Sequence, residues 1–237
     1  MKRWFYLLAA LPLLFTACRE NVEEITVTGF TYQPPQVIVT ADLSGQVVDA
    51  NGDIVTGATV RIGSLATATD ERGFFQFLDA QLNSRGTYVT VYKDGYFPGS
   101  TRFFPLNNSS NYVTIGLLDK TIAGSFSNAE GGTVTADGAQ VSLPANGVAR
   151  TNGTPYDGQV QVAVQWINPT ADNLIEIMPG NLQGVSKDGQ EVSMATFGML
   201  AVELQDEAGN ELQVAAGRTA ELTFPVPAEI RANAPAE

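Results

Sequence analysis

The chain has 237 residues, 44% of them hydrophobic and 16% charged, and its formal net charge is −12. This length suits one large β domain or two small ones, and the apolar content is sufficient for packed cores. So acidic a surface repels phosphate backbones, which argues against nucleic acid as a partner. Histidine is absent and cysteine occurs once, which excludes Ser-His-Asp and Cys-His nucleophile systems, histidine-ligated metals and an intrachain disulfide. We therefore expect no cofactor, no metal site and no enzymatic activity, although carboxylate-only chemistry stays open.

The chain opens with a positive pair, Lys2-Arg3, followed by an apolar run over residues 4–15. A membrane-spanning helix needs about 20 apolar residues, so this shorter run has the length of a secretory signal. The only cysteine, Cys18, directly follows the small residue Ala17. This arrangement resembles the bacterial lipobox, in which cleavage occurs before the cysteine and the thiol then carries a lipid. The resemblance implies a lipoprotein signal peptide at residues 1–17, a palmitate-bearing anchor on Cys18 and attachment to the outer membrane. The alternative is an ordinary signal peptide with an incidental cysteine.

Residues 18–40 are expected to form an acidic tether. Arg19 follows the cysteine, and acidic residues then continue to Glu24. Acidic residues at this place resemble the surface-export signal of lipoproteins in some Gram-negative phyla, which implies a position on the cell surface. A plain solvated tether is the other interpretation. Pro34-Pro35 favours an extended linker that becomes a first strand near residues 37–39.

Short alternating runs closed by turn residues dominate residues 43–96. The pair Asn51-Gly52 lies between two apolar pairs, and both residue types tolerate positive φ, so it predicts a tight hairpin turn. Successive side chains of a strand point to opposite faces, so each run is expected to place alternate residues together. The groups expected to share a face are Val60 with Ile62, Phe75 with Phe77, and Tyr88 with Thr90 and Tyr92. These runs predict two small sheets packed as a β-sandwich.

The same stretch carries the pattern Gly45-x-Val47-x-Asp49, Gly57-Ala58-x-Val60, Thr69-Asp70-x-x-Gly73-x-Phe75-x-Phe77 and Tyr88-x-Thr90-x-x-x-x-Gly95-Tyr96. It resembles the carboxypeptidase regulatory-like domain, a transthyretin-like β-sandwich of the prealbumin type. The resemblance covers residues 41–119 and implies a fold and no reaction, because in that family the domain is usually an accessory module. Gly73 follows Asp70 at a turn that is expected to need positive φ.

A second β-sandwich is predicted over residues 120–226, followed by a Pro/Ala-rich tail at residues 227–237. Its expected strands are residues 133–135, 140–143, 159–167, 199–205 and 221–224. In the longest of these, the buried face is predicted to hold Val160, Val162, Val164 and Trp166, with Gln161 and Gln165 on the other face. No segment after the leader predicts an amphipathic helix. The overall expectation is an all-β chain of two tandem β-sandwich domains behind the signal peptide.

Residues 131–144 and Asn146-Gly147-Val148 look like the opening of the β-domain shared by zonula occludens proteins and netrin receptors. Asn168-Pro169-Thr170, Met178-Pro179-Gly180 and residues 197–204 look closer to cartilage intermediate layer protein and the astroprincins. This second resemblance covers residues 122–225. Those relatives are extracellular or receptor-associated interaction proteins, so it implies binding and supplies no catalytic residue.

Aromatic and thioether side chains offer candidate binding surfaces. One candidate for sugar stacking or protein binding consists of Tyr92, Tyr96, Phe97, Phe103 and Phe104. A small domain needs most such rings for its core, which is the competing interpretation. Met178, Met194 and Met199 are able to line a ligand groove or to fill a core.

Carboxylates offer a further candidate site. Asp157, Asp172 and Glu176 are possible acid–base groups or calcium ligands by residue type alone, and nothing in their spacing distinguishes them from loop carboxylates. Residues 49–53 resemble the start of a calcium loop but lack the later bidentate glutamate, and a hairpin turn accounts for every residue. Lys120, at the predicted junction, is expected to be open to water.

These patterns favour a non-catalytic surface lipoprotein of the cell envelope. It would act as a structural or binding module in adhesion or interaction, with a protein or glycan partner. An alternative is an accessory domain that presents substrate to a polysaccharide- or peptide-processing system. A third option is a carboxylate-based glycosidase, which needs two carboxyl groups about 5–10 Å apart in a cleft. Paired acids in a cleft would favour the enzyme, whereas a flat aromatic patch would favour binding.

Overall fold

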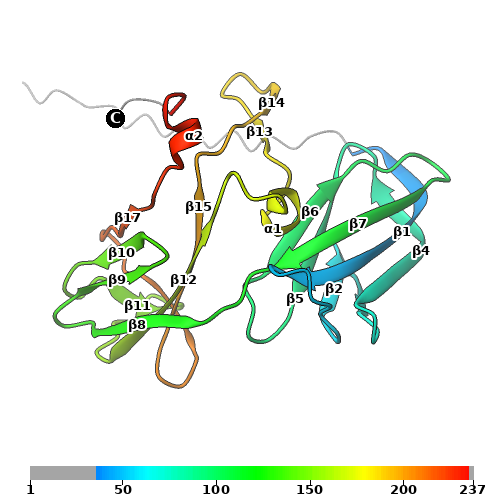
Figure 1. Ribbon diagram of the computed structural model, residues 1–237. Coiled ribbons are helices and arrows are strands. Elements are labelled where there is room, and N and C mark those ends of the chain that lie inside the picture. The colour runs from blue at the N-terminus through cyan, green and yellow to red at the C-terminus, as the bar shows by residue number, and fades with distance from the viewer. Residues whose placement is uncertain (1–35, 235–237) are drawn as a thin grey trace, which may run out of the picture. The chain divides into compact units, whose positions relative to one another are not determined.

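The first sandwich is organised around β1 (Ile38–Asp49), whose alternating residues Ala41, Leu43 and Val47 are buried. The computed structural model describes residues 36–234, so the predicted lipid site at Cys18 and the signal peptide lie outside the described residues. The strands that follow β1 are β2 (Thr59–Ile62), β3 (Leu65–Ala68), β4 (Phe74–Asn83), β5 (Thr87–Tyr92), β6 (Gly99–Phe103) and β7 (Ser110–Leu117). They form two sheets, with strand orders β4-β1-β7 and β3-β2-β5-β6 (Figure 1).

The β1 strand is paired on both sides. It runs antiparallel to β4, and it runs parallel to β7 from the pair Asp42–Ser110 to the pair Asp49–Leu117. Gly45 of β1 packs closely against the ring of Phe75. A Cβ added at Gly45 would stand only 2.6 Å from that ring. A side chain at this position is therefore incompatible with the packing of the core.

One apolar core fills the space between the two sheets. Phe75 and Phe77 meet edge to face with their ring centroids 6.2 Å apart. The alternation predicted from the sequence is confirmed for Val60, Ile62, Phe75 and Phe77, which all belong to this core, and Ile115 and Leu117 of β7 complete it.

An Asp-x-x-Gly-x turn recurs within residues 36–234, beginning at Asp49, Asp70 and Asp206. In each, one carboxylate oxygen accepts the backbone N–H groups of the second and fourth residues after the aspartate, at 2.8–2.9 Å. This accounts for residues 49–53 as a turn. The predicted Asn51-Gly52 hairpin is only partly correct, since Gly52 alone has positive φ (88°) and Ile54 makes an isolated bridge to Val48. The aspartate's hydrogen bonds set the turn, so two residues of positive φ are not needed.

The Asp206 turn gives stability a predicted dependence on pH. Hydrogen bonds from the side chain and backbone of Asn210 lower the pKa of Asp206 from 3.8, assisted by the Ala208 N–H and the Arg150 guanidinium. A lowered folded-state pKa stabilises the fold above the ordinary carboxyl pKa, and this contribution is lost as the pH falls through the folded value. Asp206→Asn should therefore have a lower melting temperature than the wild type at about pH 6, and this difference should narrow as the pH falls below the ordinary carboxyl pKa of about 4. Thermal melts of both proteins across this range measure it; a constant gap would contradict the assignment.

The second sandwich also has two sheets. Its strands are β8 (Ile122–Ser127), β9 (Gly132–Ala136), β10 (Ala139–Leu143), β11 (Val148–Arg150), β12 (Gln159–Ile167), β15 (Met199–Gln205), β16 (Glu211–Val214) and β17 (Glu221–Thr223). The sheet orders are β17-β10-β9 and β11-β16-β15-β12-β8, and β13 (Gln183–Val185) with β14 (Glu191–Ser193) forms a separate hairpin. Val160, Val162 and Val164 face the core as predicted, whereas Trp166 is only half-buried. The prediction of an all-β sandwich fold is confirmed.

A third apolar cluster, which we call the junction cluster, joins the two halves. It contains Phe97 and Leu118 from the first half, Ala163 and Ile167 from β12, and Ile177. The second face of β12, which also carries Gln161 and Gln165, is thus covered as well. The two glutamines had suggested that this face would be open to water. Residues Pro34–Glu237 form one compact unit, so the domain boundaries at residues 119/120 and 226/227 stay predictions.

The structure differs from the sequence-based expectation in two further places. The described part of the chain contains two single-turn helices, α1 (Leu174–Ile177) and α2 (Ala228–Arg231), each too short for an amphipathic period to show in the sequence. Lys120 is not open to water: its Nζ forms a half-buried ion pair with Glu203 Oε1 at 2.8 Å. Within residues 36–234 no helix is long and apolar enough to cross a membrane.

Candidate binding surface

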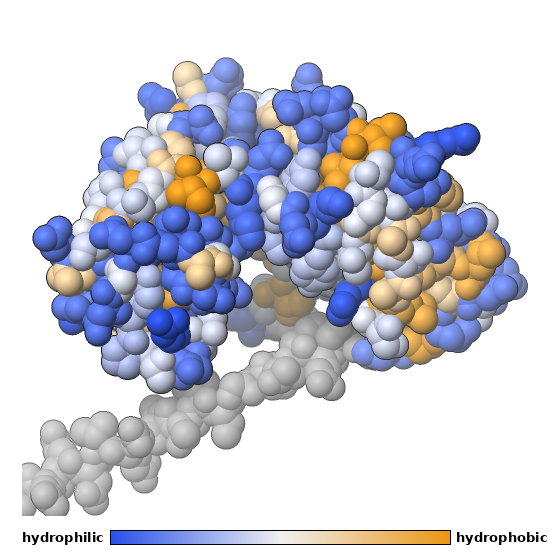
Figure 2. Space-filling view, turned by 90° about the horizontal axis from the view of Figure 1, so that it is seen from below, coloured by the Kyte–Doolittle hydropathy of each residue, from blue (hydrophilic) through white to orange (hydrophobic). Residues whose placement is uncertain are grey.

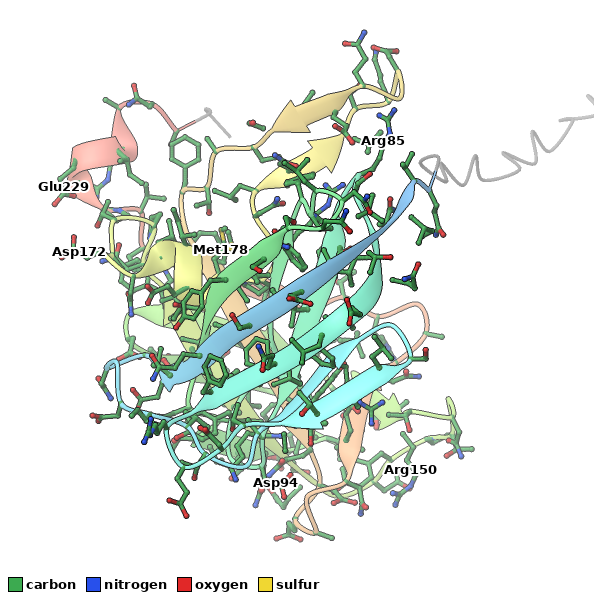
Figure 3. The ribbon with its side chains drawn as sticks, turned by 90° about the vertical axis from the view of Figure 1, so that its right-hand side faces the viewer. Arg85, Asp94, Arg150, Asp172, Met178 and Glu229 are labelled. Carbon is green, nitrogen blue, oxygen red and sulfur yellow. The ribbon has the colours of Figure 1, made fainter. Side chains whose placement is uncertain are left out.

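The outer face of the sheet β3-β2-β5-β6 carries a cluster of exposed aromatic and cationic side chains. In β5, Val89 and Val91 point into the core, while Tyr88 and Tyr92 point outward and are 52% and 46% exposed. Both rings therefore lie on a sheet face that the first core does not use. In Figure 3, the labelled Arg85 and Asp94 belong to the turns at the two ends of β5.

The strand register brings two arginines beside these tyrosines. Arg61 of β2 lies opposite Thr90, and Arg102 of β6 lies opposite Tyr88. We call the resulting surface the aromatic–arginine face; it consists of Thr59, Arg61, Tyr88, Thr90, Tyr92, Arg102 and Phe104.

Arg102 is held in place between two rings. Its guanidinium carbon lies 5.8 Å from the ring centroid of Tyr88 and 4.9 Å from that of Phe104, within cation–π range. Nη2 donates to the carbonyl oxygen of Arg85 at 2.7 Å, and Nη1 donates to Gln183 Oε1 at 3.4 Å. These contacts fix the side chain, so Arg102 orients the two rings.

Arg61 and Tyr92 form the open end of the face. The Arg61 guanidinium carbon lies 6.0 Å from the ring centroid of Tyr92, and with Thr59 the two line a shallow hollow of about 270 Å³. Within residues 36–234 the ion pairs are Lys120–Glu203 and Arg150–Asp206, so no carboxylate neutralises Arg61. The hollow thus combines an aromatic ring, a hydroxyl and an unpaired cation.

The other end of the face is bordered by the segment after α1. Gly180 N–H donates to the carbonyl oxygen of Ser100 at 3.0 Å, which places this segment along the edge of β6. The end of the face that this segment leaves open is the one on the β2 side, where Arg61 and Tyr92 lie.

The structure separates the aromatic residues predicted as one binding surface. Tyr92 and Phe104 lie on the aromatic–arginine face, whereas Tyr96 and Phe103 are half-buried against the first core and Phe97 is buried in the junction cluster. Burial, together with the nearby charge of Asp119, raises the pKa of Tyr96.

Sequence reasoning missed the two arginines of the face and did not include Tyr88 in the predicted surface. The available signal was the alternation of residues 88–92, which already placed Tyr88 and Tyr92 on one side. The cross-strand neighbours, Arg61 and Arg102, required the strand pairing.

The other predicted candidates are dispersed. Met178 is buried, Met199 packs on the junction cluster, and Met194 is 51% exposed. No group of three acidic or cysteine side chains in the described part of the chain lies close enough to hold a metal ion. Asp157, Asp172 and Glu176 therefore join no such group; Figure 3 labels Asp172 near α1.

Aliphatic surface is unevenly spread. In the face shown in Figure 2, hydrophilic side chains predominate, and apolar ones gather mainly on the right, over the first sandwich. Exposed aliphatic residues of that sandwich include Leu65 (42%) and Leu78 (63%). These residues carry no charge and stand on strands β3 and β4, apart from the Arg61–Tyr92 hollow.

No protein-family model matches this chain. The chain is similar to cartilage intermediate layer protein 1 of Sus scrofa, with 28% identity over 72 residues, or 30% of this chain and 12% of that protein. Cartilage intermediate layer protein 2 of Homo sapiens is 32% identical over 76 residues, or 32% of this chain and 7% of that protein. A resemblance to these proteins is confirmed over about a third of the chain, whereas its placement at residues 122–225 stays a prediction. The chain spans only a small part of the length of these relatives.

Two solved structures show a low similarity. A membrane-associated protein of unknown function from Bacteroides fragilis is 12% identical with a TM-score of 0.27, covering 80% of this chain and 91% of that one. A protein from Bacteroides uniformis described as carbohydrate-binding is 10% identical with a TM-score of 0.28, covering 72% of this chain and 81% of that one.

Proposed function

We propose that this chain is a non-catalytic binding module of a bacterial surface lipoprotein and that it binds an acidic glycan through the aromatic–arginine face. The observation that carries the proposal is the unpaired Arg61 beside the exposed ring of Tyr92, on a flat sheet face that also holds Tyr88.

The chemistry of the face suits a sugar chain. A pyranose has apolar C–H faces that pack on aromatic rings, while its hydroxyl groups at the edge accept and donate hydrogen bonds, as do tyrosine and threonine. Tyr88 and Tyr92 are four residues apart on one strand, so their backbones lie about 13 Å apart. The two rings therefore contact different sugar units of an extended oligosaccharide.

The charge of the face favours an acidic sugar. A guanidinium forms two parallel hydrogen bonds with a carboxylate, and Arg61 has no carboxylate partner of its own in the described structure. The chain's net charge of −12 repels anions from most of its surface. An acidic sugar therefore has to bind where a local cation offsets this repulsion, and the unpaired Arg61 in the hollow is such a cation.

The proposal includes the anchor expected from the leader. A lipid on Cys18 would hold the module at the outer membrane, and residues 19–35 would separate it from the bilayer. The first sandwich would belong with the carboxypeptidase regulatory-like domains, whose accessory role agrees with a chain that presents a ligand without transforming it.

A binding experiment tests the glycan ligand. We expect the full-length protein to bind an oligogalacturonate more tightly than a neutral oligosaccharide of equal length, as measured by calorimetry. Tyr92→Ala should weaken binding about fivefold or more, because it removes the aromatic contact. Arg61→Gln should abolish the preference for the acidic sugar. Tyr112→Ala is the matched control, since Tyr112 is 61% exposed on β7 of the other sheet.

Equal loss of affinity in Tyr92→Ala and Tyr112→Ala would contradict the site. Binding of neutral and acidic sugars with the same affinity by the wild type would contradict the role of Arg61. Turnover of either sugar would overturn the non-catalytic assignment.

A further inference from the structure

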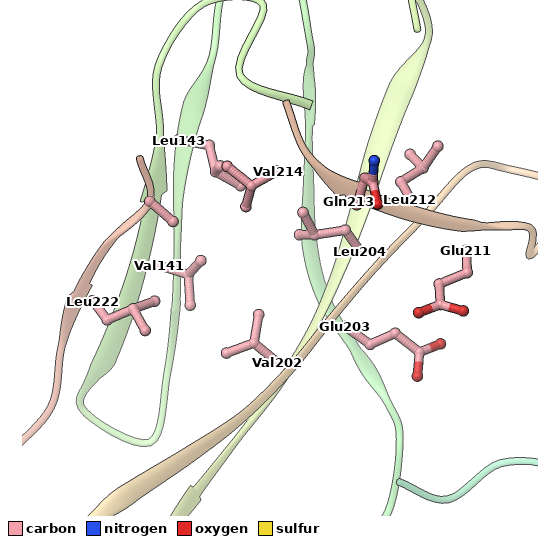
Figure 4. Close-up of a pocket in the computed structure, with 11 residues that line it drawn as sticks. Val141, Leu143, Val202, Glu203, Leu204, Glu211, Leu212, Gln213, Val214 and Leu222 are labelled. Atoms are coloured by element: carbon pink, nitrogen blue, oxygen red, sulfur yellow. The ribbon is translucent and has the colours of Figure 1, made fainter. Parts of the chain in front are cut away.

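An apolar groove opens along one side of the second sandwich. It has a volume of about 280 Å³ and lies between the two sheets, with β10 and β17 on one wall and β15 and β16 on the other (Figure 4). Its lining is aliphatic over most of its length, including Val141, Leu143, Val202, Leu212 and Leu222.

Both walls of this groove end in an unpaired strand edge. β16 pairs with β15 only at Leu204 and Gln205, so over residues 199–203 β15 has a described partner, β12, on one side only. β17 pairs with β10, and no other described strand lies on its free side. An unpaired edge presents free N–H and C=O groups to any extended chain that reaches it.

The groove leaves inward-facing aliphatic side chains in contact with water. Leu222 is 49% exposed and Val214 is 38% exposed, although both belong to faces that elsewhere in the sandwich are closed. Burying such surface contributes about 25 cal/mol per Å² of apolar area. A strand laid between the sheets would cover these side chains with its own alternate residues.

The charges at the rim indicate what kind of strand fits. Glu203 and Glu211 lie at the same end of the groove (Figure 4), and Glu203 is already paired with Lys120. A second copy of this acidic chain would meet like charges here, whereas a segment with lysine or arginine would meet opposite ones.

We propose that this groove binds an extended segment of a partner protein by strand addition, independently of the glycan site. The segment forms backbone hydrogen bonds with the free edge of β15 over residues 199–203 and places alternate aliphatic side chains against Leu222 and Val141. A basic residue of the segment lies near Glu211. This is a recognised way of binding peptides, in which the backbone supplies affinity and the alternate side chains supply specificity.

Synthetic peptides as long as β15, 7 residues, test the proposal with the full-length protein. The probe is Lys-Val-Thr-Val-Thr-Val-Lys. Two comparison peptides have glutamate at both ends, or proline in place of the central valine, which removes a backbone donor. We expect the lysine peptide to bind and to slow exchange of those amides within residues 199–203 that face away from β12. It should bind at least about fivefold more tightly than either comparison peptide.

Leu222→Gln should lower the affinity for the lysine peptide about fivefold or more, because it removes apolar contact. Leu106→Gln is the matched control, since Leu106 is 72% exposed outside the groove. Glu211→Gln should reduce the preference for lysine over glutamate ends. The proposal is overturned if the proline peptide binds equally well, if Leu222→Gln has no effect, or if no peptide binds. It is equally overturned if residues 199–203 are protected without peptide in a dimer, because the occupant is then a second copy.

Discussion

Replacing Gly73 with valine is expected to lower the free energy of unfolding by about 3–5 kcal/mol. Gly73 has φ of +68°, a conformation that costs an L-residue about 1–2 kcal/mol. A Cβ there would also lie 2.7 Å from the carbonyl oxygen of Val47 and 2.9 Å from Ile54 Cγ2. The first contact is with backbone, and Val47 N–H in turn donates to Gly73 O at 2.8 Å, so neither strand is free to move away. Chemical denaturation of the full-length protein measures the loss.

Gly52→Val separates the two causes of that loss. Gly52 has φ of +88° in a turn of the same design, but nothing lies within 4 Å of a Cβ there. Gly52→Val should therefore lower the free energy of unfolding only by the conformational cost of positive φ, about 1–2 kcal/mol. If both variants lost the same stability, the contact of Gly73 with β1 would have no energetic role.

Asn128→Ala is expected to destabilise the second sandwich by about 3–5 kcal/mol. The residue is 1% exposed, and its Nδ2 donates to the carbonyl oxygens of Val148 at 2.9 Å and Tyr156 at 2.6 Å. Its Oδ1 accepts the Val148 N–H at 3.0 Å. Alanine would leave these three buried backbone groups without partners, and each such group costs about 1–3 kcal/mol.

The control for this prediction is Asn152→Ala. Asn152 is exposed, and its Oδ1 accepts hydrogen bonds only from its own turn, from Thr154 N and Oγ1. Because water can replace these bonds, the loss should stay within about 1 kcal/mol. A comparable loss in both variants, measured by denaturant titration, would show that burial of Asn128 is not what makes its bonds important.

The strands were predictable because each has an alternation that one buried face imposes. Val160, Val162 and Val164 are an example, and so are Phe75 and Phe77. The contacts of a strand's other face do not follow from alternation. Ala163 shares its face of β12 with Gln161 and Gln165, but it is buried in the same cluster as Leu118 and Phe97. That contact depends on how two separately predicted sandwiches meet.

The candidate binding surface was predictable to a similar extent. The outward position of Tyr92 follows from the period of β5. Arg61 is 31 positions away in the chain, and it lies near Tyr92 only because β2 pairs with β5 in one particular register. The burial of Phe97 likewise depends on the junction cluster, which no local pattern indicates.

The parallel pairing of β1 with β7 has a mechanical consequence. β1 is the first strand of its sandwich and β7 the last, and their pairing extends from Asp42–Ser110 to Asp49–Leu117. Force that pulls Ile38 and Leu117 apart acts along this ladder, so its hydrogen bonds are sheared together instead of being peeled open one by one. Resistance to such pulling is set by the rate of unfolding and not by the equilibrium stability alone. The first sandwich is therefore expected to resist tension applied between its first and last strands better than its equilibrium stability alone would suggest.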